Sequence, residues 1–259
     1  MARAARRPGA RRTLLLDLDG TLAPIARTPS EARVPPETLD ALRSLVRQGW
    51  TVAIVSGRPA TEARRMVPLR GVKIFGSHGL EGCWSRRGAR SPSPGLRRRL
   101  ARLARAARLL SAATPGLLVE HKPSGLALHD RLLPRGRRAA WRRRLDAWLD
   151  RQDLRGLERI EGKCVTELRP LGAHKGQVVA SLPARSNAPL PDASLVGVGD
   201  DRTDEDLFRA LRGRGLAIRV GRPGLRSAAR WRLTSPAAVR RFLAELSRAD
   251  DGPYKLGFP

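Results

Sequence analysis

Three short apolar runs, each ending at a polar residue, constrain the fold of this chain most strongly. They span Thr13–Leu16, Thr51–Val55 and Ser194–Val198. Runs of this length without polar alternation are typical of parallel strands that are buried on both faces. A helical pattern over Pro36–Gln48 separates the first two runs and completes a βαβ unit. The sequence therefore predicts an α/β fold, with a Rossmann-like core built on an open parallel sheet.

Polar residues follow each of the three predicted strands. Asp17, Ser56 and Asp200 stand at or next to the point where a strand ends. Ligands of open parallel sheets bind beyond the carboxyl ends of the strands. These three distant segments are therefore expected to converge on one site.

The middle of the chain departs from this alternation and predicts an insert with the order α-β-β-α-β-β. The helices of this insert are expected over Leu96–Leu110 and Arg137–Leu149, and its four strands lie between residues 117 and 168. After the insert, the next helix of the core is expected over Ala173–Leu182. We expect a cap domain at 94–171, inserted between two core segments at 1–93 and 172–259. A basic arm at 1–12 and a loose tail at 249–259 are expected at the two ends.

Asp17 and Asp19 lie two residues apart at the end of the first strand, so both carboxylates are expected to face one pocket. In such a pair the first carboxylate can attack a phosphoryl group while the second moves a proton to and from the leaving group. Gly20 and Thr21 complete a loop whose backbone N–H groups can receive phosphate oxygens. An Asp-X-Asp triplet is weak evidence by itself, because it also occurs in ordinary turns.

The run Asp17-Leu18-Asp19-Gly20-Thr21-Leu22 resembles the first motif of the haloacid dehalogenase superfamily of phosphohydrolases, and three later motifs follow in the superfamily's order. These are Ser56-Gly57-Arg58, Lys175-Gly176 and Gly199-Asp200-Asp201. The resemblance implies a haloacid-dehalogenase-like core in which Asp17 becomes phosphorylated and Asp19 is the acid and base. It also implies phosphate binding by Gly20, Thr21, Ser56, Gly57, Arg58 and Lys175, and Mg²⁺ held by Asp17, Asp19, Asp200 and Asp201.

Each later motif also has a structural interpretation that needs no ligand. Ser56 suits a strand-to-helix turn as an N-cap, and the acidic residues from Asp200 to Asp206 suit the start of a helix. Lys175 is harder to explain in this way, because a cation near a helix start is disfavoured by the helix dipole. The joint occurrence of four motifs in order favours the phosphatase interpretation.

Further strings resemble the trehalose-6-phosphate phosphatase family in particular. They are Asp17–Ile25, Gly76–Glu81, Glu120–Lys122 with His129–Arg131, Gly162–Pro170 and Gly199–Asp206. The resemblance implies hydrolysis of trehalose 6-phosphate to trehalose and phosphate, the last step of trehalose biosynthesis, through an aspartyl-phosphate. It assigns sugar contacts to His78, Glu120, Lys122, Arg131 and Glu167.

Two alternatives stay open for these cap residues. Glu120, Lys122 and Glu167 could be cross-strand ion pairs on a solvated sheet face. Within the same superfamily, the substrate could instead be sucrose 6-phosphate or mannosyl-3-phosphoglycerate.

The formal net charge of +27 raises the separate possibility of a nucleic-acid-binding protein. Aromatic residues make up only 4% of the chain, so platforms for base stacking are scarce. We expect no nucleic-acid partner and no membrane span, although an anionic partner for the arginine surface stays open. Cys83 and Cys164 suggest neither a metal site nor a disulfide framework, which favours a reducing cytoplasm. About a dozen residues precede the first strand, so a separate trehalose-phosphate synthase is the expected pathway partner.

Overall fold

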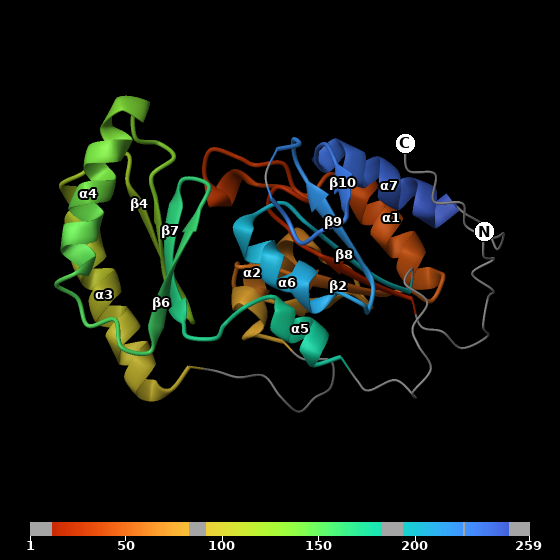
Figure 1. Ribbon diagram of the computed structural model, residues 1–259, viewed down its shortest axis with the longest axis horizontal. Coiled ribbons are helices and arrows are strands. Elements are labelled where there is room, and N and C mark those ends of the chain that lie inside the picture. Colours follow the sequence, from red (N-terminus) through yellow and green to blue (C-terminus); the bar gives the residue numbers. More distant parts are fainter. Residues whose placement is uncertain (1–11, 83–91, 183–193, 225, 249–259) are drawn as a thin grey trace.

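The computed structural model describes residues 12–82, 92–182, 194–224 and 226–248. Within these ranges the chain forms two sheets with helices packed against them (Figure 1). The greater part of the predicted basic arm, the predicted tail and Cys83 lie outside the described residues. No helix in the described segments combines the length and apolar character needed to cross a membrane.

The larger sheet has six parallel strands in the order β10-β9-β8-β1-β2-β3. The strands are β1 Thr13–Leu16, β2 Thr51–Val55, β3 Lys73–Phe75, β8 Leu195–Gly199, β9 Leu216–Val220 and β10 Trp231–Leu233. The first strand pairs with both β2 and β8, so the three predicted strands are neighbours in the sheet. This confirms the predicted α/β fold with a parallel core.

Helices cover both faces of this sheet, because successive side chains of β1 pack against different pairs of helices. Leu14 and Leu16 pack into a cluster with residues of α1 Pro36–Arg47 and α7 Pro236–Arg248. Leu15 packs into a different cluster with residues of α5 Gly176–Ala180 and α6 Glu205–Ala210. All three leucines are fully buried, which explains why the strand has no polar alternation. The helix α2, Ala60–Met66, connects β2 to β3.

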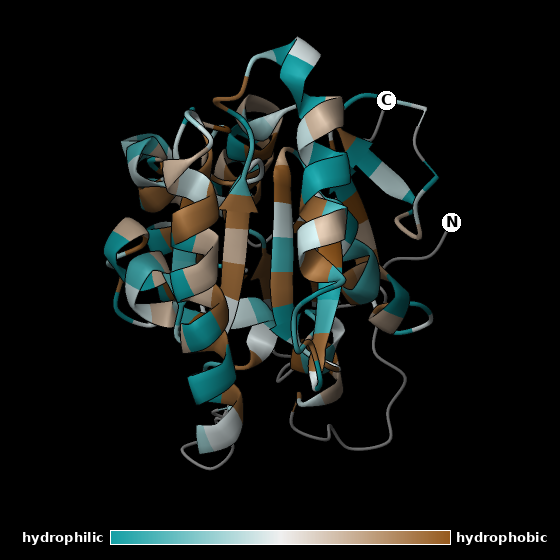
Figure 2. Cartoon of the chain, turned by 90° about the vertical axis from the view of Figure 1, so that its left-hand side faces the viewer, coloured by the Kyte–Doolittle hydropathy of each residue, from teal (hydrophilic) through white to brown (hydrophobic). Residues whose placement is uncertain are grey.

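The smaller sheet is antiparallel, with the order β4-β5-β7-β6. Its elements are β4 Leu118–Lys122, β5 Gly125–His129, β6 Leu157–Gly162, β7 Val165–Pro170, and the helices α3 Pro94–Ala112 and α4 Arg138–Leu149. The two helices cover one face of the sheet, and the other face is turned toward the six-stranded sheet (Figure 1). Figure 2, viewed from the helix side, shows the alternating polar and apolar segments of these amphipathic helices.

Four helices differ from their predicted limits, α1 and α4 by one residue and α3 and α5 by more. The helix α3 begins at Pro94 rather than Leu96, because the Ser93 hydroxyl accepts a hydrogen bond from Leu96 N and Pro94 fits the first position. The helix α5 begins at Gly176 rather than Ala173, because Ala173 N donates to Pro170 O in the turn that leaves β7.

Two leucines on α3 test whether the smaller sheet has its own core. Leu100 is fully buried in the cluster under this sheet, whereas Leu109 on the same helix is 73% exposed. We expect Leu100→Ala to lower the free energy of unfolding by about 3 kcal/mol, because it leaves a cavity. The matched control Leu109→Ala should change it by less than about 0.5 kcal/mol. Equal effects of the two substitutions in urea unfolding would contradict this packing.

Candidate active site

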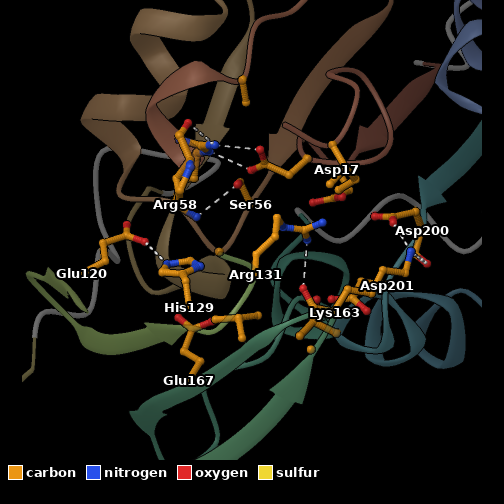
Figure 3. A pocket seen from close by; sticks show the side chains of 18 of the residues that line it. Asp17, Ser56, Arg58, Glu120, His129, Arg131, Lys163, Glu167, Asp200 and Asp201 are labelled. Carbon is orange, nitrogen blue, oxygen red and sulfur yellow. Dashed lines mark hydrogen bonds and ion pairs between the residues drawn. The ribbon is translucent and has the colours of Figure 1, made fainter. Parts of the chain in front are cut away.

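A pocket lies between the carboxyl ends of the parallel strands and the open face of the smaller sheet (Figure 3). Asp17 and Asp19 follow β1, Ser56 and Arg58 follow β2, and Asp200 follows β8. The residues contributed by the smaller sheet and its turns include Glu120, Lys122, His129, Arg131, Lys163 and Glu167. Apart from His129 and Lys163, these are predicted site residues, and the structure brings them together. Of the other predicted residues, Gly57, His78, Lys175 and Asp201 also line the pocket, and Gly20 and Thr21 lie in the loop behind Asp17.

Asp17 is buried and shares the ammonium group of Lys175 with Asp204. Lys175 Nζ donates to Asp17 Oδ1 at 2.5 Å and to Asp204 Oδ1 at 2.7 Å. Burial raises the pKa of Asp17, as does the nearby Asp204, while Lys175 opposes this shift. Burial works against the charge of Lys175, but Asp17 and Asp204 raise its pKa above the ordinary value. The result is a carboxylate held beside a permanent cation.

The described acidic residues include one cluster compact enough to hold a metal ion. Carboxylate oxygens of Asp17, Asp200 and Asp204 lie within 4.8 Å of one another. Both oxygens of Asp204 are already engaged, since Oδ1 binds Lys175 and Oδ2 accepts from Asp200 N and Asp201 N. Asp200 Oδ1, by contrast, is buried without a hydrogen-bond partner. An all-oxygen set with an unsatisfied buried carboxylate oxygen fits Mg²⁺.

Asp19 and Asp201, two of the four predicted metal ligands, are not part of this cluster. The Asp19 carboxylate accepts two hydrogen bonds of 2.7 Å from the Arg58 guanidinium. Asp201 caps the turn that follows β8, in a capping box with Asp204. Both carboxylates therefore have partners other than a metal in this structure.

Burial also governs the electrostatics of Asp200. It raises the pKa of this carboxyl to about 6, while the ammonium of Lys163 partly opposes the shift. Lys163 comes from the turn between β6 and β7, and its Nζ lies 2.6 Å from Asp200 Oδ2. The smaller sheet thus reaches the acidic cluster through one lysine.

The loop after Asp17 positions that residue through Gly20 and Thr21. Gly20 has a φ of 84°, and a Cβ at this position would collide with the Asp200 carboxylate. Its N–H donates to Ala23 O, and Thr21 Oγ1 lies 3.3 Å from Asp17 Oδ2. Gly20 and Thr21, which were predicted to bind phosphate, hold the loop and Asp17 in place in this structure.

The segment after β2 forms a tight turn that presents a guanidinium group. Ser56 Oγ accepts a hydrogen bond from Arg58 N at 3.1 Å within this turn, and the N-cap of α2 is Pro59, so the N-cap interpretation of Ser56 was wrong. Arg58 Nη2 also donates to Pro29 O, which fixes the side chain beside Asp19. Gly57 leaves room for the imidazole of His78, because a Cβ there would lie 2.7 Å from His78 Cε1.

His78, Lys122 and Glu167 connect the two sheets. His78 Nε2 lies 3.0 Å from Glu167 Oε2, and Lys122 Nζ lies 2.9 Å from Glu167 Oε1. Lys122 Nζ also donates to Gly57 O at 3.0 Å. These side chains are buried, which argues against ion pairs on a solvated face. Ser77 and His78 have φ values of 48° and 58°, a strained conformation of the kind that is concentrated at functional sites.

Glu120 lies in register with Ala127 and Glu167 on the face of the smaller sheet that lines the pocket. Its Oε2 is 2.9 Å from His129 Nε2. Arg131 Nη2 donates to Lys163 O at 2.9 Å and leaves much of its guanidinium without a described partner. The pocket wall therefore offers both acidic and basic hydrogen-bonding groups, as a ligand rich in hydroxyls requires.

Asp204 and Lys163 are site residues that were not among the predicted ones. Both lie in strings that the sequence singles out, Gly199–Asp206 and Gly162–Pro170. Four acidic residues surround Asp204 in its string, so the pattern alone did not distinguish it. The complete burial of Asp204 and its bond to Lys175 identify it as a positioning residue.

Known proteins match this chain over most of its length. The family model for trehalose-phosphatase matches residues 15–236. A probable trehalose-phosphate phosphatase of Sinorhizobium fredii is 34% identical over 242 residues, covering 90% of this chain and 87% of the relative. An uncharacterized glycosyl hydrolase of Mycobacterium tuberculosis is 35% identical, and the match covers 92% of this chain but only 18% of that longer protein.

Solved structures give the same result. A crystal structure of a trehalose-6-phosphate phosphatase related protein superposes with a TM-score of 0.71 at 26% identity, covering 91% of this chain and 96% of the other. A phosphatase of the haloalkanoate superfamily from Bacteroides thetaiotaomicron, with 15% identity and a TM-score of 0.58, shares the fold.

Substitution of Glu167 tests the buried contacts that connect the two sheets. Burial alone would raise the pKa of Glu167, but Lys122 and His78 hold it below the ordinary value of about 4.3. The ionised carboxylate therefore stabilises the folded protein above about pH 4.5, and this contribution disappears as the pH falls toward the folded-state pKa. We expect Glu167→Gln to cost about 2 kcal/mol at pH 7, because it leaves Lys122 with a weaker partner.

The measurement is urea unfolding of the wild-type protein and of the Glu167→Gln variant from pH 7 to pH 3. The difference between them should shrink below about pH 4.5. Glu37→Gln is the control, because Glu37 is exposed and lies 3.9 Å from Arg240; it should change stability by less than about 0.5 kcal/mol throughout. A difference for Glu167→Gln that is constant with pH would contradict the ionised pairing.

Proposed function

This chain belongs to the trehalose-phosphatase family, and we propose that it hydrolyses trehalose 6-phosphate to trehalose and phosphate, with Asp17 as the nucleophile. The observation that supports this most directly is the buried Asp17 beside Lys175, at the end of the central strand. The reaction would complete trehalose biosynthesis, with a separate synthase supplying the substrate.

In the proposed first step, Asp17 attacks phosphorus and forms an aspartyl-phosphate. The Lys175 ammonium would reduce the repulsion between the attacking carboxylate and the phosphate dianion. Ser56, Gly57, Arg58 and Lys175 would bind the phosphate oxygens, while Gly20 and Thr21 would hold the loop that carries Asp17. Asp204 would hold Lys175 in position through its 2.7 Å hydrogen bond.

Asp19 would protonate the sugar oxygen as it leaves and then take a proton from the attacking water. In this structure Asp19 is bound by Arg58 through both guanidinium hydrogen bonds. Transfer of Arg58 to the substrate phosphate would release Asp19 for proton transfer. Hydrolysis of the aspartyl-phosphate then returns Asp17 and releases phosphate.

Magnesium would be held by Asp17 and Asp200, whose carboxylates belong to the compact acidic cluster. When bound, Mg²⁺ supplies positive charge that offsets the nucleophile and the phosphate. The sequence also assigned Asp19 and Asp201 to the metal, and the partners of these two carboxylates favour other roles.

The smaller unit, residues 94–171, would act as a cap over the core formed by 1–93 and 172–259. Glu120, Lys122, Arg131 and Glu167 would bind the sugar hydroxyls, and His78 would hold Glu167 in place. The contacts of Lys122 with Gly57 O and of His78 with Glu167 support a closed cap that limits the access of water.

Replacement of the proposed nucleophile tests this function. Asp17→Asn should lower phosphate release from trehalose 6-phosphate with Mg²⁺ by at least about 10³-fold, because an amide does not attack phosphorus. Asp40→Asn, on the exposed face of α1, is the matched control and should retain activity. Turnover by the Asp17 variant at the wild-type rate would refute the proposal.

The same assay with other phosphate esters tests the substrate. Wild-type protein should release phosphate from trehalose 6-phosphate faster than from sucrose 6-phosphate, mannosyl-3-phosphoglycerate or glucose 6-phosphate. A clear preference for one of the other three would reassign the substrate while leaving the chemistry of Asp17 intact.

A further inference from the structure

A second cavity, which we call the arginine cleft, lies beside the proposed active site. It has a volume of about 560 Å³, within the range of small-molecule sites. The arginine cleft forms where the β6–β7 turn meets the residues that follow β8 and β9, and it shares Gly162, Lys163 and Asp201 with the active-site pocket. Its lining comprises Gly162, Lys163, Asp201, Arg202, Glu205, Arg209, Arg212, Arg219, Arg226, Ser227 and Ala228.

Basic side chains dominate this lining. It contains five arginines and one lysine but only two carboxylates, and both carboxylates are engaged. Glu205 accepts hydrogen bonds from Arg219 Nη1 at 2.5 Å, from Ser227 Oγ and from Ala228 N. Asp201 caps the turn after β8. Among the described residues, neither carboxylate forms an ion pair with the other arginines of the lining, and the cations outnumber the carboxylates six to two.

Three arginines of the cleft are exposed and have no ion-pair or hydrogen-bond partner for their side chains among the described residues. They are Arg202, Arg212 and Arg226. Arg209 binds Asp206 at 2.8 Å, and Lys163 binds Asp200, so these two are already paired. Three like charges that converge on one concave surface produce a strong positive potential, which an anion would relieve.

The chemistry of the lining indicates the class of ligand. Guanidinium groups match phosphate oxygens with two parallel hydrogen bonds each. The lining has no aromatic side chain, and Ala228 is its only residue with an apolar side chain, so the cleft favours the charged groups of a ligand over an apolar or aromatic part. We propose that the arginine cleft binds a small anion with two or more phosphate groups, at a site separate from that of the substrate phosphate.

Calorimetric titration of the full chain with inorganic pyrophosphate, in EDTA and 150 mM NaCl, tests this site. The double variant Arg212→Glu/Arg226→Glu should weaken binding at least tenfold. The control Arg102→Glu/Arg105→Glu makes the same change of charge at two exposed arginines of α3, far from the cleft lining, and should stay within twofold of the wild type. Orthophosphate should bind more weakly than pyrophosphate.

Three results would overturn the proposal. Equal loss in the two double variants would show that only the net charge matters. Unchanged binding in Arg212→Glu/Arg226→Glu would place pyrophosphate elsewhere, for example in the catalytic pocket. Equal affinity for orthophosphate would exclude a requirement for more than one phosphate group. If the charge reversal prevents folding, Arg212→Gln/Arg226→Gln replaces it, and the loss should still exceed that of Arg102→Gln/Arg105→Gln.

Discussion

The buried ion triad of Asp17, Lys175 and Asp204 is the interaction on which the proposed active site depends. Charged groups this deeply buried are costly to desolvate, and they are stable only when each has a close partner. Lys175 supplies that partner to both carboxylates at 2.5 and 2.7 Å. The triad joins the end of β1, the start of α5 and the turn after β8, which are more than 150 residues apart at the extremes. Its charges thereby fix the geometry of three segments that the sheet alone would leave adjustable.

The same triad explains why Asp17 is suited to phosphoryl transfer. A carboxylate in bulk water is a weak nucleophile toward a phosphate dianion, since both are negatively charged. Burial beside a permanent ammonium group reduces that repulsion without requiring solvent to reorganise during the reaction. Contacts from the smaller sheet complete the enclosure, since Lys122 reaches Gly57 O and Lys163 reaches Asp200. The open face of this sheet is therefore part of the site, although the triad comes from the core.

The three strands that carry the site could be predicted to within one residue, whereas β9 and β10 were not among the predicted strands. The strands Thr13–Leu16 and Thr51–Val55 have the predicted limits, because each apolar run ends directly before a polar residue of the site. The site was harder to predict, since it depends on pairings over long sequence distances. Nothing local to Asp19 indicates that Arg58 will bind it, and nothing local to Asp204 distinguishes it from its acidic neighbours. The left-handed backbone at Ser77 and His78 also has no signal in residue type, because such conformations favour glycine.

The most direct test is to identify the atom that receives the phosphoryl group. Wild-type protein mixed with ³²P-labelled trehalose 6-phosphate and Mg²⁺, quenched in acid within milliseconds, should carry label in an acid-stable form that hydroxylamine removes. Reduction of the quenched protein with borohydride, followed by peptide mass analysis, should convert residue 17 to homoserine. Recovery of the label on any residue other than Asp17 would contradict the central role assigned to this carboxylate.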